Sequence, residues 1–172
     1  ADFIIRAREL ATQAGNATLS PQQRAGIGTE LAQIHSSLVS LANARDSAGH
    51  ALFGGEAAGQ AYTLDGAGNA LYAGTASAGE LPLGDGQSVS RGLTGPEFLN
   101  FTGPAGPTDL FATIKALGEA LQGAAANPAQ AARDALDTLG SALEKVTTSQ
   151  TIVGTRLAWI ELTTDRRIEL SE

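Results

Sequence analysis

One apolar stripe near the C-terminus constrains the fold more than any other feature of this sequence. It recurs at steps of four and three residues, through Ala132, Leu136, Leu139, Leu143, Val146, Gln150, Val153, Leu157 and Ile160. This spacing places its members on one face of an α-helix. A helix from Pro128 to Glu172 would hold about 45 residues and extend for roughly 68 Å at 1.5 Å per residue. A helix this long spans a distance or aligns neighbouring helices, so it favours a structural protein over an enzyme.

Composition excludes several classes of protein. A length of 172 residues allows one domain, or one domain with a small insertion, and an apolar content of 42% is enough for a core. A net charge of −7 argues against a nucleic-acid-binding protein, which needs a basic face. The absence of cysteine excludes disulfides and cysteine-based zinc sites. The sequence contains no run of 18 apolar residues, which is the length that a membrane-spanning helix needs.

Start and stop signals predict two helices in the first part of the chain. The first covers residues 2–15 and should end in a left-handed turn at Gly15-Asn16. The second begins with a capping box, in which Ser20 is the N-cap and Gln23 its partner. It should end near Gly49-His50. Its predicted buried stripe is Ile27, Leu31, Ile34, Leu38 and Leu41.

Helical signals return after residue 108. Asp109 is a good N-cap for a helix that should end around Gly123, with a stripe made of Leu110, Ile114, Leu117 and Leu121. Asn127, directly before Pro128, then repeats the start signal for the long C-terminal helix.

Most of the 21 glycines lie between residues 49 and 106, where the helical periodicity stops. Residues 62–64 and 70–72 predict a β-hairpin with a five-residue loop. A second run, residues 80–93, has a turn signal at 84–86. The Gly-Pro pairs at 95–96, 103–104 and 106–107 predict loops.

These elements predict an α+β fold. We expect an elongated antiparallel α-helical bundle or rod built from residues 1–51 and 107–172, with a small, mainly β domain at 52–106 inserted into it. The helices must pack together, because none of them can bury its stripe alone. Both ends of the chain lie within helical patterns, so we expect a core fragment that lacks both terminal segments.

No residue is predicted to be catalytic, cofactor-binding or metal-binding. His35 lies beside the stripe of its helix and should face solvent, and His50 should lie at a helix end. Residues 65–69 faintly resemble the start of a calcium loop, but Ala76 stands where a glutamate is required, so a hairpin turn is favoured. No GxSxG, HExxH or phosphate-binding loop occurs.

Two residues of the long helix, Gln150 and Trp159, allow more than one interpretation, and a third, Gly154, has one explanation. Gln150 is the polar member of the stripe, and it could fix the helix register or lie at the wet end of the core. Trp159 could anchor another subunit, although packing within the molecule is favoured. Gly154 is explained by a close approach of helices.

Two terminal motifs resemble a known superfamily. Residues 7–14, Ala-Arg-Glu-Leu-Ala-Thr-Gln-Ala, followed by Ser20 and Arg24, resemble the first conserved region of bacterial flagellins. Residues 153–157, Val-Gly-Thr-Arg-Leu, with Ile160-Glu161, resemble the C-terminal region. Five central stretches (42–46, 52–55, 62–64, 71–74 and 84–86) are similar to the hook–filament junction branch, hook-associated protein type 3. The resemblance covers nearly the whole chain.

This resemblance implies a structural axial component of the bacterial flagellum, exported through the flagellar type III apparatus to the extracellular flagellum. It would act as an adaptor between the first hook-associated protein, on the hook side, and the flagellin filament. The implied partners also include copies of itself in a ring and an export chaperone, with no nucleic acid, membrane or cofactor.

Two alternatives remain at this point. One is a short flagellin that forms the filament itself. The other is a secreted enzyme or carbohydrate-binding module with its site in the Gly-rich insertion. That reading needs convergent acids, and the available ones are scattered: Glu56, Asp65, Glu80, Asp85 and Glu97.

Overall fold

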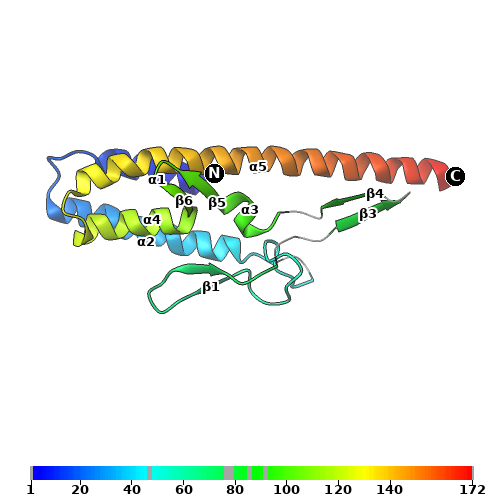
Figure 1. The fold of residues 1–172 in the computed structure, drawn as a ribbon, viewed down its shortest axis with the longest axis horizontal. Helices are drawn as coiled ribbons and strands as arrows, with labels where there is room; N and C mark the ends of the chain where they lie inside the picture. The colour runs from blue at the N-terminus through cyan, green and yellow to red at the C-terminus, as the bar shows by residue number, and fades with distance from the viewer. Residues whose placement is uncertain (1, 46–47, 76–79, 85–86, 91–92, 172) are drawn as a thin grey trace.

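The computed structural model describes the backbone of residues 2–45, 48–75, 80–84, 87–90 and 93–171, and their side chains except those of 80–84, 87–90 and 150–171. The long helix α5 (Pro128–Ser171) runs along the molecule, and the other elements lie beside it (Figure 1). Helix α1 (Asp2–Ala14) packs along α5, while α2 (Pro21–Ala42) packs on α4 (Leu110–Glu119). The chain is therefore mainly helical and elongated, with small antiparallel hairpins, in agreement with the predicted α+β class.

Helix α5 begins where the sequence predicts. The side-chain oxygen of Asn127 accepts a hydrogen bond from the backbone N–H of Gln130 at 3.2 Å. The buried face of its first half is Ala129, Ala132, Leu139, Ala142, Val146 and Ser149. Leu136 and Leu143 of the predicted stripe are half-buried at the border of this face. The side chains of Gln150, Gly154 and Trp159 lie outside the described part of the chain.

Helix α1 fits against α5 because its buried face is also made of small and medium-sized residues, namely Ile4, Ala7, Leu10, Ala11 and Ala14. Small side chains on both faces allow the two helices to approach closely. An ion pair between Arg6 and Glu30, with an N–O distance of 2.7 Å, links α1 to α2. Residues 7–14 therefore contribute to the buried surface that joins α1 to α5.

The turn between α1 and α2 confirms one prediction and corrects another. The capping box is present: the N–H of Gln23 donates to the Ser20 hydroxyl at 3.1 Å, and the N–H of Ser20 donates to the Gln23 side chain at 2.9 Å. The predicted left-handed conformation is wrong for Gly15, whose φ is not positive. Instead, the Gly15 carbonyl accepts a hydrogen bond from the Arg133 guanidinium at 3.1 Å. A cation from α5 thus closes the C-terminus of α1.

Helix α2 ends at Ala42, and the predicted end near Gly49-His50 is wrong. After the helix the chain turns back on itself, so that Arg45 forms an isolated antiparallel bridge with Ala51. His50 consequently lies on an exposed loop and not at a helix end. Leu41, the last member of the predicted stripe, is 55% exposed because it lies in the final turn of α2.

The first predicted hairpin is confirmed with its register. Strands β1 (Tyr62–Leu64) and β2 (Ala70–Tyr72) pair antiparallel, with Tyr62 opposite Tyr72 and Leu64 opposite Ala70. The loop is closed by the Asp65 carboxylate, which accepts hydrogen bonds from the backbone N–H groups of Ala67 and Asn69. A second pair, β3 (Glu80–Gly84) and β4 (Gln87–Ser90), occupies the second predicted run, and its turn residues 85 and 86 lie outside the described residues.

The Gly-Pro pairs do not mark loops alone. Gly95–Leu99 forms the short helix α3, with a proline in its first turn. Strands β5 (Asn100–Gly103) and β6 (Gly106–Asp109) form a third hairpin, and β5 packs on α5. Proline is tolerated in β6 because a two-stranded hairpin has only edge strands. Both strands were missed because they are short and lack alternation. The division into a rod and an inserted domain at 52–106 stays a prediction.

Helix α4 follows its predicted signals. The Asp109 carboxylate accepts a hydrogen bond from the N–H of Ala112 at 2.9 Å, and Leu110, Ile114, Leu117 and Leu121 are buried as expected. The helix continues into a π-helical turn, η1 (Ala120–Ala124), where Gly123 adopts a φ of 112°. Gly28 of α2 meets Gly118 of α4 so closely that a Cβ on Gly28 would lie 2.9 Å from the Gly118 carbonyl oxygen.

Candidate functional site

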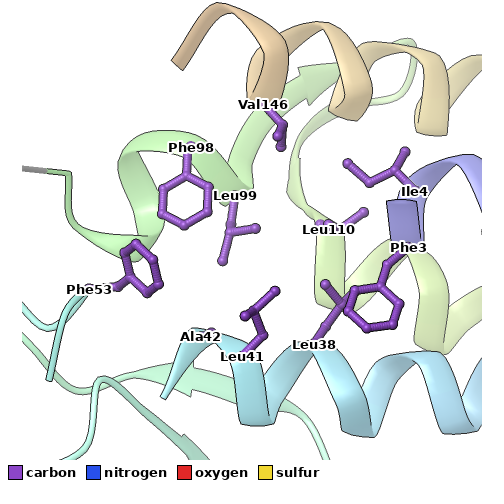
Figure 2. Close-up of a pocket in the computed structure, with 10 residues that line it drawn as sticks. All are labelled: Phe3, Ile4, Leu38, Leu41, Ala42, Phe53, Phe98, Leu99, Leu110 and Val146. Atoms are coloured by element: carbon purple, nitrogen blue, oxygen red, sulfur yellow. The ribbon is translucent and has the colours of Figure 1, made fainter. Parts of the chain in front are cut away.

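An apolar cavity lies where the N-terminal end of α1 and the C-terminal end of α2 meet α3, α4 and the middle of α5 (Figure 2). Its volume is about 150 Å³. Ten side chains line it and form what we call the apolar joint: Phe3, Ile4, Leu38, Leu41, Ala42, Phe53, Phe98, Leu99, Leu110 and Val146. All ten are hydrocarbon. The cavity therefore offers no acid, base or nucleophile for a reaction.

The apolar joint is closed at its floor and open at its rim. Ile4 and Leu110 are almost fully buried, whereas Leu41 is half-exposed. The rings of Phe53 and Phe98 meet edge to face with their centroids 5.1 Å apart, which fixes the loop after α2 against α3. The lining side chains come from five helices and one loop. Figure 2 shows them converging on a central space. This cluster connects the short elements to the long helix.

A second connection holds the β1–β2 hairpin to the end of α2. The side-chain amide of Asn43 donates to the Tyr62 carbonyl at 3.0 Å, and its side-chain oxygen accepts from the Tyr62 N–H at 2.8 Å. Asn43 thus serves both as the C-cap residue of α2 and as a substitute strand partner for β1. Sequence reasoning missed this role, and the only signal for it was the position of Asn43 next to the last helical residues.

Tyr62 is the buried centre of this connection. Its ring packs on Phe111 of α4 and on Tyr72, with centroid separations of 4.9 Å and 5.4 Å. Its hydroxyl is buried against Gly95, where a Cβ would collide with the ring, and has no hydrogen-bond partner among the described residues. Burial raises the pKa of this phenol well above its usual range. Tyr62 is therefore a packing residue, and its hydroxyl stays protonated.

The prediction that His35 faces solvent is wrong. It is 9% exposed, and its ring meets Phe111 edge to face at a centroid distance of 5.9 Å. Its Nε2 atom has no hydrogen-bond partner within the described part of the chain. Burial lowers the pKa of His35, and the nearby Lys115 lowers it further, while Asp109 acts in the opposite direction. The position beside the stripe was misread because α4 covers more than one face of α2.

The acids of the insertion whose side chains are described do not converge on a site. Glu56 and Asp65 are exposed, and Glu97 is half-buried on α3, whereas Glu80 and Asp85 lie outside the described side chains. Hydrogen bonds from Asn69 lower the pKa of Asp65, which matches its role in closing the hairpin loop. Among the described residues no three potential metal ligands gather, and none of the helices searched is long and apolar enough to cross a membrane. Asp65 thus holds the hairpin loop in place.

Comparisons with known proteins establish the class of fold. No protein-family model and no curated protein matches the sequence. Solved structures of flagellar junction and hook-associated proteins do match the chain over nearly its whole length. With sequence identities below 25%, these matches establish that the chain has the fold of that class.

Three of these structures have the same TM-score of 0.84. FlgL from Xanthomonas campestris is 20% identical, and the match covers 99% of this chain and 86% of that chain. Hook-associated protein 3 from Legionella pneumophila is 15% identical, with 98% and 84% covered. A putative flagellar hook-associated protein from Vibrio parahaemolyticus is 22% identical, with 99% and 75% covered.

Proposed function

We propose that this protein is a structural subunit of the bacterial flagellum that acts as an adaptor at the hook–filament junction. The observation that carries the proposal is the match to FlgL over 99% of this chain at a TM-score of 0.84. The sequence motifs support it independently, because Ala7, Leu10, Ala11 and Ala14 of the first motif form the buried face of α1. The family resemblance and the fold thus agree on the same residues.

The mechanism of such a subunit is mechanical. Helix α5 has 44 residues, which corresponds to a length of roughly 66 Å. Helices α1 and α4 and the hairpin β5–β6 pack against it and resist its bending. A braced helix of this length transmits force along its axis, and the subunit needs no chemical step to do so. We accordingly propose that the protein is not an enzyme.

The proposed adaptor connects the first hook-associated protein, on the hook side, to flagellin, on the filament side, in a ring formed with copies of itself. We propose that it reaches the extracellular flagellum through the flagellar type III apparatus and that an export chaperone protects it beforehand. In this arrangement residues 1–51 and 107–172 form the rod, and residues 52–106 form a small outer domain.

Deletion of the full-length gene in the flagellated bacterium that carries it tests the proposal. We expect electron microscopy to show hooks without filaments, while flagellin is released into the medium. Re-expression of the wild-type gene should restore filaments. Cells that keep normal filaments after the deletion would contradict the proposed function.

A second experiment separates the adaptor from a short flagellin. A filament protein is present in thousands of copies per flagellum, whereas a junction ring holds only a few. Quantitative mass spectrometry of sheared flagella should therefore find this protein far below the major filament protein. An abundance equal to that of the major component would instead identify it as the flagellin.

A further inference from the structure

The cavity of the apolar joint has the properties of an apolar binding site that opens to solvent at its rim. All ten lining side chains are hydrocarbon, so water at the floor of the cavity finds no side-chain hydrogen-bond partner. An apolar occupant displaces this water and gains dispersion contacts with the lining atoms.

We propose that the apolar joint binds one small, uncharged hydrocarbon group of the size of benzene. The cavity volume of about 150 Å³ sets the size, because apolar cavities of roughly this volume in other proteins bind benzene or xenon. The lining sets the chemistry, because a charged or hydrogen-bonding ligand would lose its hydration without compensation. The half-exposed side chain of Leu41 at the rim marks the entrance.

Occupancy of this site would stabilise the connection between the short elements and the long helix. The lining residues come from α1, α2, α3, α4, α5 and the loop at Phe53, so a single ligand contacts all of them. A ligand that binds only the folded protein raises the melting temperature, and the rise continues as the ligand concentration exceeds the dissociation constant. The site thus couples ligand binding to the rigidity of the joint and does not depend on the proposed flagellar role.

Benzene titration followed by methyl NMR tests the proposal directly. We expect saturable shifts of the methyl groups of Leu38, Leu99 and Val146, with a dissociation constant on the order of 1 mM, because so small a ligand buries little surface. The methyl groups of Leu31 and Leu117 serve as internal controls, since both are buried but neither lines the cavity. Benzene should also raise the melting temperature.

Two variants with opposite effects on the volume complete the test. Ala42→Leu adds three carbon atoms to the wall from a helical position and should abolish the benzene shifts and the gain in melting temperature. Leu99→Ala enlarges the cavity and should extend binding to a larger ring such as indole. Shifts that fail to saturate, that affect Leu31 equally, or that persist in Ala42→Leu would overturn the proposal, and so would unchanged spectra of the wild-type protein.

Discussion

The substitutions Gly28→Ala and Gly26→Ala make the same chemical change two positions apart on α2, and we expect them to have opposite effects on stability. Alanine is favoured over glycine inside a helix by up to about 1 kcal/mol. A Cβ on Gly26 would meet no atom within 4 Å, so Gly26→Ala should stabilise the protein by most of that amount. A Cβ on Gly28 would lie 2.8 Å from Cγ of Gln122 and 2.9 Å from the carbonyl oxygen of Gly118.

The two collisions at Gly28 differ in how easily they are relieved. The Gln122 side chain is exposed and can rotate away. The Gly118 carbonyl belongs to the backbone of α4, so relief there requires the two helices to separate. Overpacking of this kind costs about 1–3 kcal/mol. Because the gain in helix propensity offsets about 1 kcal/mol, we expect a net loss of roughly 1 kcal/mol, and a difference of about 2 kcal/mol between the two variants.

Urea denaturation followed by far-UV circular dichroism measures this difference. Gly118→Ala adds an internal ranking, because its Cβ would lie 3.4 Å from the Gly28 carbonyl and should be tolerated better than Gly28→Ala. Equal stability of Gly26→Ala and Gly28→Ala would show that α2 and α4 do not cross at Gly28 in solution, and the reasoning would fail.

Four further substitutions probe the core, the buried histidine and the hairpin connection. Leu139→Ala should lower the free energy of unfolding by about 2–5 kcal/mol, because Leu139 is fully buried. Leu143 is half-buried, so Leu143→Ala should cost less. Equal losses in denaturant titrations would mean that the buried face of α5 is misplaced. The pKa of His35 is lowered from 6.5 by burial, so stability should be fully present above about pH 6.5 and fall as the pH drops through the lowered folded-state value. His35→Leu should flatten that dependence in urea midpoints measured between about pH 8 and pH 5, and an unchanged slope would exclude His35 as its origin. Asn43→Ala removes both hydrogen bonds to the Tyr62 backbone and should speed hydrogen exchange at the Tyr62 amide while leaving the core of α2 protected; unchanged exchange at that amide would contradict the role assigned to Asn43.

Local signals explain which parts of the fold the sequence predicts. The capping box at Ser20, the N-cap at Asp109 and the start at Asn127 each involve residues within three positions of one another. The β1–β2 register follows from a short loop closed by the nearby carboxylate of Asp65. In each case hydrogen bonds between neighbours in the chain fix the conformation, so the pattern and the structure agree.

The wrong predictions arise where residues distant in the sequence determine the local structure. Helix α2 stops at Ala42 because Asn43 turns its side chain to Tyr62, nineteen positions later. Gly15 needs no left-handed turn because Arg133, from α5, caps the end of α1. His35 is buried because α4 places Phe111 against it. Neither hydropathy periods nor turn residues in one sequence report such partners.

The candidate site shows the same division. Its members from α2 and α4, such as Leu38 and Leu110, were predicted to be buried on helical stripes. Phe53 and Phe98 were not, because they belong to a loop and a one-turn helix without a period of their own. A cavity is a property of the space between elements, so the sequence could indicate its walls but not its existence.

The pairing of α1 with α5 has a consequence for how the protein folds during translation. The face formed by Ala7, Leu10 and Ala11 is covered by a helix that is translated more than a hundred residues later. Until α5 emerges, the nascent chain has a partner for Arg6 in Glu30 but no cover for that face. Completion of the core is thereby delayed until α5 has been translated, as expected for a topology whose key contacts join sequence-distant segments.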